Sequence, residues 1–338
     1  MEYRPLGRTG VQVSKLCLGT MMFGAWGNTD HDDSIRIIRR ALDAGINFVD
    51  TADVYSAGES EEIVGKALKG RRDDVVLATK FFVPMGDDPN QRGGSRRWII
   101  TEVENSLKRL GTDWIDLYQV HRPDPDTDVE ETLSALTDLV QQGKVRYIGS
   151  SSYSAGEIVE AQWTTRDRRL ERFRTEQPPY SLLVRGIELD VLPTTKRHGM
   201  GILTYSPLAG GWLSGSWNAD RSPTSPARQR LSARFDMSLP ENQRKLQAVE
   251  QLATVAGDAG VTLIELAIGF VVNHPAVTSA IIGPRTMEQL DSQLPAAGVA
   301  LDPDSLDRID EIVKPGVNLN PADTSYGEQV LKPSLRRR

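Results

Sequence analysis

The chain has 338 residues, and its formal net charge of −6 comes from acidic and basic residues that are mixed along its length. This length suits one large α/β domain, and no basic face of the kind that binds nucleic acid stands out. No apolar run reaches the roughly 18 residues of a membrane-spanning helix, and the N-terminus lacks a signal-peptide pattern. The single Cys17 excludes an internal disulfide, and the four histidines lack metal-ligand spacing. We expect a cytoplasmic enzyme or binding protein with no metal and neither a nucleic-acid nor a membrane partner.

The first 14 residues predict a β-hairpin, because two short extended pieces flank the turn-rich Gly7-Arg8-Thr9-Gly10. After the hairpin, short apolar segments alternate with helical patterns. The predicted strands are 15–18, 46–50, 75–80, 115–121, 145–150, 175–177, 201–205 and 280–282.

Helical periodicity fills the intervals between these strands, and the last predicted helix is 304–313. Ser60 is predicted to cap the second helix of the alternating series. Three further helices are predicted to begin with capping boxes, which are Asp128-x-x-Glu131, Ser154-x-x-Glu157 and Thr286-x-x-Gln289. Residues 206–240, rich in Gly, Ser, Pro and Arg, predict a long loop, and residues 316–338 predict an irregular tail.

Strict alternation of strands and helices predicts a parallel sheet with right-handed crossovers. Eight strand-helix units favour closure into a (β/α)8 TIM barrel rather than an open sheet. No G-x-G-x-x-G follows any predicted strand, which argues against a dinucleotide-binding sheet of the open type. We expect one α/β barrel domain over residues 1–338, with the N-terminal hairpin and extra C-terminal helices.

In a barrel of this kind, chemistry is expected at the C-terminal ends of the strands. The residues predicted there are Gly19, Asp50, Lys80, His121, Ser151, Gln177, Tyr205 and Gly283, with Tyr55 just beyond Asp50. We expect buried Lys80 to need Asp50 as a partner, and its field to lower the pKa of the Tyr55 phenol. His121 would orient a carbonyl oxygen that Tyr55 protonates. The pattern predicts a site that polarises a carbonyl group while another group delivers a hydride.

The motifs LGRTGVQVSKLCLGT, NFVDTADVY, LKRLGTDWIDLYQVHRPD, GKVRYIGSSSY and SAIIGPRTMEQL follow one another along the chain. In these motifs the chain resembles the aldo-keto reductase superfamily over nearly its whole length, in a bacterial branch similar to potassium-channel β-subunits. The resemblance implies that Asp50, Tyr55, Lys80 and His121 form the catalytic tetrad, with Tyr55 as proton donor. It also implies NADPH/NADP+ as the cofactor and a small carbonyl compound as the substrate.

The resemblance further implies a set of cofactor contacts. Ser151, Ser152 and Gln177 would hold the carboxamide, Tyr205 would stack on the nicotinamide, Ser206, Leu208, Gly210 and Leu213 would line the pyrophosphate path, and Gly283, Arg285, Gln289 and Gln293 would surround the adenosine end. A helix N-terminus beside Arg285 is also an anion site on physical grounds. Ser152 and Gln293 depart from the family pattern, which usually has Asn at the first position and often at the second.

Substrate contacts are expected from Tyr55, His121 and Trp26. Trp26 would form one wall of the pocket. The segment Arg96-Arg97-Trp98 follows the third barrel strand, and Trp212 and Trp217 fall in the long loop. The arginines could meet an acidic or phosphorylated substrate and the tryptophans could contact the substrate, but surface charge and packing are the ordinary interpretation of these residues.

Three functions stay open. The first is an NADPH-dependent reductase of an aldehyde or ketone, and the second is an NADPH-binding accessory subunit with slow turnover. The third is a Schiff-base aldolase using Lys80, which leaves Tyr55 and Arg285 unexplained. The sequence does not specify the physiological substrate, the reaction direction or the oligomeric state. A homo-oligomer is one of the states left open.

Overall fold

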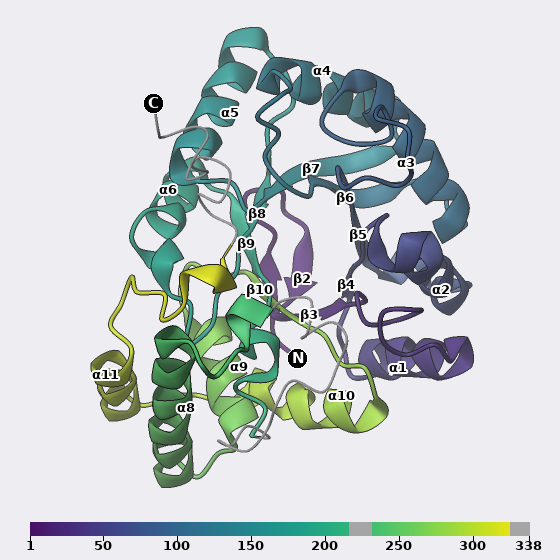
Figure 1. Ribbon diagram of the computed structural model, residues 1–338. Helices are drawn as coiled ribbons and strands as arrows, with labels where there is room; N and C mark the ends of the chain where they lie inside the picture. Colours follow the sequence, from purple (N-terminus) through teal and green to yellow (C-terminus); the bar gives the residue numbers. More distant parts are fainter. Residues whose placement is uncertain (216–231, 325–338) are drawn as a thin grey trace.

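The structure, a computed structural model, describes residues 1–215 and 232–324. Eight parallel strands close into a barrel in the order β10-β3-β4-β5-β6-β7-β8-β9, with helices ranged around it (Figure 1). The strands are β3 (Leu16–Gly19), β4 (Phe48–Asp50), β5 (Val76–Phe81), β6 (Ile115–Val120), β7 (Val145–Ser151), β8 (Thr175–Gln177), β9 (Gly201–Thr204) and β10 (Ser279–Ile282). The predicted (β/α)8 barrel is therefore confirmed, and the strand bounds differ from the predicted ones by at most two residues at either end.

The helices alternate with these strands. They are α1 (His31–Asp43), α2 (Glu59–Leu68), α3 (Arg96–Leu110), α4 (Val129–Gln141), α5 (Ala155–Arg168), α6 (Val191–His198), α8 (Pro240–Asp258), α9 (Leu263–Asn273), α10 (Met287–Gln293) and α11 (Pro303–Ile312). Neighbours pack in sequence from α1 to α6, and α10 contacts both α9 and α1, which brings the last helices of the ring back to the first. Outside this ring, α8 packs on both α9 and α11 (Figure 1).

The predicted hairpin is confirmed as β1 (Tyr3–Pro5) paired antiparallel with β2 (Gln12–Ser14). Its Leu6 and Val13 are fully buried among the inward-facing residues of the barrel. Gly7 has a φ of +57°, and a Cβ there would lie 2.7 Å from the backbone nitrogen of Gly201, where β9 starts. The hairpin therefore covers the N-terminal end of the barrel and leaves the opposite end for the site.

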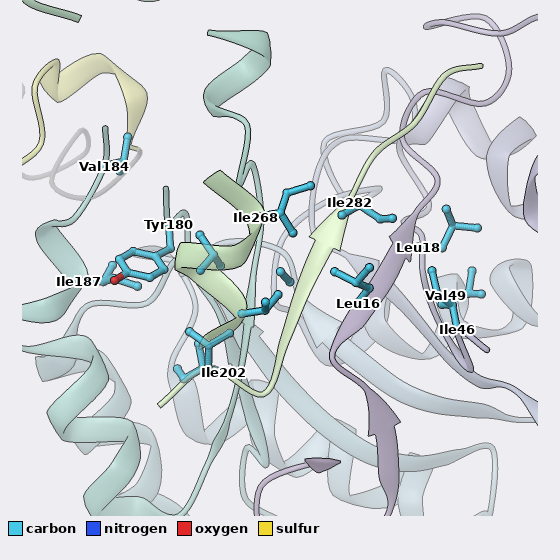
Figure 2. Packing of buried hydrophobic residues seen from close by; sticks show 14 of the residues in the cluster. Leu16, Leu18, Ile46, Val49, Tyr180, Val184, Ile187, Ile202, Ile268 and Ile282 are labelled. Carbon is cyan, nitrogen blue, oxygen red and sulfur yellow. The ribbon is translucent and has the colours of Figure 1, made fainter. Parts of the chain in front are cut away.

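Two apolar cores lie on the two faces of the sheet, because successive side chains of a strand point to opposite sides. The inner core contains Cys17, Phe48, Ala78, Leu117, Leu203 and Ile281. The outer core lies between strands and helices, and Figure 2 shows Leu16 and Leu18 of β3 beside Ile282 of β10. The register pairs Leu16 with Ala280 and Leu18 with Ile282, so this contact closes the barrel.

One predicted helix start is wrong. Helix α2 begins at Glu59, after Gly58 in the left-handed region (φ +94°), and Ser60 lies inside the first turn. The Ser60 hydroxyl instead donates to the carbonyl oxygen of Thr20 at 2.8 Å, which ties α2 to the end of β3. Ser60 therefore serves a tertiary contact rather than a cap.

The other capping predictions are confirmed in whole or in part. Ser154 and Glu157 exchange reciprocal bonds in a full capping box. Asp128 and Thr286 do cap α4 and α10, but the reciprocal half of each box does not form. The side-chain oxygen of Gln289 accepts from the backbone N–H of Arg285 instead.

The described part of the predicted loop contains two short 3-10 turns, Ala209–Gly211 and Ser232–Arg234. Residues 216–231, which include Trp217, lie outside the described residues, as do residues 325–338 of the predicted tail. Residues 316–324 are irregular except for the 3-10 turn Pro321–Asp323. Within the described ranges, no single helix has the length and apolarity to cross a bilayer; α8 and α9 meet that test only when joined across an 89° bend.

Candidate active site

Four strands place polar side chains inside the barrel, one step above the inner apolar core. The alternation that turns Phe48, Ala78 and Leu117 inward also turns the residue two positions later inward, and Thr175, which lies near Leu117 across Gly149, has the same relation to Gln177. These later residues are Asp50, Lys80, Gln119 and Gln177, all of them buried. The strand ends therefore form one buried polar layer at the C-terminal side of the inner core.

Lys80 is the centre of this layer. Its Nζ lies 2.5 Å from Oδ1 of Asp50, and it also donates to the Thr51 carbonyl at 2.8 Å and to the Tyr55 hydroxyl at 3.2 Å. Burial alone would lower the pKa of Lys80, but the Asp50 carboxylate and the Tyr55 phenol more than offset it and raise the pKa. Lys80 is therefore a protonated, fully fixed cation.

The second oxygen of Asp50 is held by two amides. Oδ2 accepts from Nε2 of Gln119 at 3.1 Å and from Nε2 of Gln177 at 2.9 Å. The remaining hydrogen of Gln177 Nε2 goes to Oε1 of Gln119 at 3.2 Å. The Gln177 amide thus faces Asp50, and only its Oε1 remains for the carboxamide contact that the family resemblance implies. Gln119 was not singled out, although period-two counting back from His121 finds it.

Tyr55 lies at the start of a strained turn, Tyr55–Gly58, that follows β4. Ser56 (φ +49°) and Ala57 (φ +56°) both occupy the left-handed region, which costs free energy for residues other than glycine. The turn is pinned because the Ser56 hydroxyl donates to the Phe23 carbonyl and accepts from the backbone N–H of Trp26. This arrangement points the Tyr55 hydroxyl at Lys80.

The pKa of Tyr55 does not shift as the sequence predicts. Burial raises the pKa of the phenol above its ordinary value of 10, and Lys80 offsets only part of that rise. The predicted lowering counted the cation and omitted the desolvation that accompanies a nearly closed position. Tyr55 is therefore a protonated phenol at neutral pH.

His121 follows β6 and lies beside Tyr55. The two ring centroids are 5.9 Å apart and the planes meet at 79°. Burial, together with the positive charges of Lys80 and Arg122, holds the pKa of His121 well below 6.5, so the imidazole is neutral. Its Nδ1 is buried without a hydrogen-bond partner among the described residues.

Trp26 lies beside Tyr55. Its ring centroid lies 6.0 Å from that of Tyr55, and the side chain is partly exposed at the rim. The neighbouring N–H of Ala25 donates to Glu59 at 2.8 Å, and His31 Nε2 contacts the other oxygen of Glu59 at 2.6 Å. The turn carrying Trp26 is therefore fixed to the start of α2.

The opposite wall of the site joins β7 to β9. Ser152 adopts a left-handed conformation (φ +60°), and its Oγ lies 3.3 Å from the Tyr205 hydroxyl. Arg122, which the sequence pattern did not single out, donates from Nη1 to Ser152 Oγ at 3.2 Å and to the His121 carbonyl at 2.6 Å. Ser151 uses its hydroxyl to bond the Gln177 carbonyl at 2.9 Å.

A buried acid supports this wall from outside the barrel. Glu176 precedes inward-facing Gln177 and so points toward the helices, where it accepts from the Ser150 hydroxyl at 2.5 Å and the Tyr153 N–H at 3.0 Å. Burial raises its pKa to about 8. These bonds bracket Ser152 and hold it in its strained conformation.

The remaining residues of the implied cofactor path lie after β9 and β10. Ser206, Leu208, Gly210 and Leu213 occupy the described start of the long loop. Beyond β10, a Cβ on Gly283 would meet no atom within 4 Å, and the Arg285 side chain is exposed. Gln293 is buried, and its Oε1 has no hydrogen-bond partner in the described chain. These features leave open space and unused polar groups along one edge of the barrel mouth.

Comparison with known proteins decides the family. The model of the aldo/keto reductase family matches residues 15–314. This chain belongs to the aldo/keto reductase family. Relatives include the uncharacterized oxidoreductase YrpG of Bacillus subtilis, 42% identical over 92% of this chain and 96% of that protein. The aldo-keto reductase YhdN of Bacillus subtilis is 37% identical over 99% of both chains, and a probable voltage-gated potassium channel subunit beta of Arabidopsis thaliana is 37% identical over 93% and 97%.

Membership of the aldo/keto reductase family, with relatives named as oxidoreductases, makes this protein an oxidoreductase that acts on small molecules. The family generally uses nicotinamide cofactors. Asp50 and Tyr55, which the sequence analysis grouped with Lys80, both contact Lys80 Nζ in this aldo/keto reductase.

The arginine and tryptophan residues named in the sequence analysis, apart from Trp26, lie away from Lys80 where the structure describes them. Trp98 is buried in the outer core, because α3 begins at Arg96 and carries Trp98 in its first turn. Arg96 pairs with Asp138 on α4, and Arg97 is exposed. Trp212 is fully buried and stacks on Phe235 with ring centroids 6.2 Å apart. In this aldo/keto reductase these side chains pack or face solvent, in line with their ordinary interpretation.

Proposed function

We propose that the protein reduces an aldehyde or ketone to an alcohol with NADPH, and that Tyr55 donates the proton. The observation that carries the proposal is the pair of contacts at Lys80 Nζ, 2.5 Å to Asp50 and 3.2 Å to the Tyr55 hydroxyl. A fixed cation beside a phenol stabilises the phenolate that remains after proton transfer. When bound, NADPH would supply a hydride from its nicotinamide ring to the carbonyl carbon, and the loss of that hydride would oxidise it to NADP+.

The protein's own contribution is to place and hold a proton. Because its pKa is raised, Tyr55 carries its proton before reaction, and it gives that proton to the carbonyl oxygen as negative charge develops there. The phenolate that forms faces Lys80 in a buried position, where the interaction is stronger than in water. Solvent then returns the proton to Tyr55.

His121 would orient the substrate. Since its pKa is held well below neutrality, it is a neutral hydrogen-bond donor rather than a competing acid. Its ring stands nearly perpendicular to that of Tyr55, so both side chains can approach one carbonyl oxygen. Trp26 at the rim would limit the width of the substrate.

Several residues support NADPH as the cofactor. Oε1 of Gln293, buried and without a partner in the described chain, fits a ligand amino group, and the space beyond Gly283 leaves room for the nucleotide. The exposed Arg285 precedes the N-terminus of α10, a combination that suits the 2′-phosphate which distinguishes NADPH from NADH. Tyr205, held by Ser152, offers a ring on which the nicotinamide would stack.

The two alternatives differ in support. A Schiff-base aldolase needs an unprotonated lysine, and the raised pKa of Lys80 argues against it. An accessory subunit is favoured by one observation, the 37% identity to the Arabidopsis thaliana protein named as a probable channel β-subunit. That candidate would bind NADPH and turn over slowly.

A titration of tryptophan fluorescence with NADPH and with NADH tests the proposal, followed by a panel of aldehydes and ketones monitored at the NADPH absorbance. We expect quenching by NADPH at lower concentration than by NADH, and turnover of several carbonyl compounds. Absence of quenching by both nucleotides would overturn the proposal. Tight NADPH binding with negligible turnover across the panel would favour the accessory subunit.

A further inference from the structure

Arg122 carries a positive charge into the reaction site without an acidic partner. One nitrogen, Nη1, makes both of its hydrogen bonds, to the His121 carbonyl at 2.6 Å and to Ser152 Oγ at 3.2 Å. Both acceptors are neutral. Over residues 1–215 and 232–324, neither Nε nor Nη2 makes a hydrogen bond, and no carboxylate lies within 4.0 Å of the guanidinium. Part of the guanidinium fork is thus unused.

The charges around Arg122 do not cancel it. Asp50 and Lys80 form a pair that is neutral as a whole, and the His121 imidazole is uncharged. Asp124, two residues along the chain, directs Oδ2 to the Gly94 N–H and the Thr127 hydroxyl, both at 2.7 Å. The described reaction site therefore has a net positive charge that belongs to Arg122.

This charge acts on the reacting groups themselves. The positive charge of Arg122 contributes to lowering the pKa of Tyr55, against burial, and that of His121. Its position is fixed by two elements, because His121 follows β6 while Ser152 follows β7. A half-buried, immobilised guanidinium with free nitrogens is well suited to bind a carboxylate through two parallel hydrogen bonds.

We propose that Arg122 anchors a carboxylate of the substrate, so that the preferred substrates are aldehydes or ketones that also carry a carboxylate. This inference rests on the proposed function, since it names the substrate class of the same site. The carboxylate binds at Arg122 while the carbonyl oxygen lies between Tyr55 and His121. The distance between the two groups on the substrate is then set by the protein.

A matched pair of substrates tests the proposal: 4-carboxybenzaldehyde and its methyl ester, which has a similar shape and no charge. The wild type should reduce the acid with a kcat/KM roughly tenfold or more above that of the ester, a difference of about 1.4 kcal/mol. In Arg122→Gln, kcat/KM for the acid should fall by roughly tenfold or more through KM, while the ester changes far less. Arg122→Lys keeps the charge and loses the guanidinium fork, so its kcat/KM for the acid should lie between those of the wild type and Arg122→Gln.

Arg97→Gln is the matched control, because Arg97 is exposed on α3 and should leave the acid-to-ester ratio unchanged. If kcat/KM fell equally for the acid and the ester in Arg122→Gln, the proposal would be overturned. Arg122 would then serve to position Ser152 and His121. Equal kcat/KM for acid and ester in the wild type would overturn it as well.

Binding separates this inference from the proposed function. Calorimetric titration with benzoate and with benzamide, in the presence of NADPH, should show benzoate binding more tightly to the wild type and equally weakly to Arg122→Gln. If this difference appears while neither aldehyde is reduced, the anion site stands and the reductase function fails. If both aldehydes are reduced but benzoate has no advantage, the reductase stands and the anion site fails.

Discussion

Lys80 and Asp50 form an ion pair inside the barrel, 2.5 Å between Nζ and Oδ1, with both side chains almost completely shielded from solvent. Removing either member of such a pair leaves an uncompensated buried charge. The pair also holds the cation that faces Tyr55. Its integrity is therefore expected to matter for both stability and turnover, and the two effects can be separated.

Lys80→Met should reduce turnover by roughly a hundredfold or more, because the phenolate of Tyr55 would form without a neighbouring cation. It should also lower the free energy of unfolding by about 3–5 kcal/mol, since Asp50 would be left with amide donors alone. Steady-state kinetics and urea denaturation measure the two quantities. The double variant Asp50→Asn, Lys80→Met should regain part of the stability and none of the turnover. Turnover restored in the double variant would contradict the role given to Lys80.

Tyr55→Phe should lower kcat by about 10²–10⁴, the range expected for loss of a general acid. The only hydrogen bond of the hydroxyl in the described structure is the one from Lys80, so the ring should keep its place. NADPH affinity, measured by fluorescence quenching, should change by less than about threefold. If the affinity collapses instead, Tyr55 supports the cofactor rather than the proton transfer.

Arg109→Met should lower the free energy of unfolding by about 3–5 kcal/mol. Arg109 Nε lies 2.6 Å from Glu61 and Nη2 lies 2.5 Å from Glu102, and both carboxylates are buried between α2 and α3. Arg168→Met is the control, because Arg168 is exposed and its ion pair with Glu130 lies at the surface, so the free energy of unfolding should stay nearly unchanged. Similar losses in the two variants, by urea denaturation, would show that the buried pairing carries no special weight.

Glu176→Gln should change the pH dependence of stability. The pKa of Glu176 is about 8 in the folded state against an ordinary 4.5, so the folded state binds the extra proton between these values. The protonated acid stabilises the folded state fully below pH 4.5, and this stabilisation is lost as the pH rises through 8. The free energy of unfolding falls by up to about 5 kcal/mol over this range. The Tm of the wild type relative to Glu176→Gln should therefore fall between pH 5 and pH 8. Parallel Tm curves would rule this out.

Much of the fold is written in local patterns. Apolar strands with a period of two and helices with a period of 3.6 occur in strict alternation, and eight such units have few ways to pack other than a closed barrel. The meeting of Asp50 and Lys80 is predictable for a related reason, because a lysine at the end of a buried strand needs a partner.

The parts that were not predicted depend on neighbours distant in sequence. Ser60 looks like a helix cap until Gly58 and Thr20 are placed beside it. The direction of the Tyr55 pKa depends on how completely the surrounding turns exclude water, which no local pattern encodes. Arg122 looks like a surface residue in sequence, and only the approach of Ser152 from β7 shows that it faces the site.

The pairing of β3 with β10 has a consequence for how the protein is made. Leu16 and its partner Ala280 lie far apart along the chain, so β3 keeps one unpaired edge until β10 has been synthesised. During that interval the nascent chain presents an open strand to its surroundings, and chaperones that shield such edges would be most useful then. A chain cut short before β10 would contain the other seven barrel strands but would be unable to close the barrel.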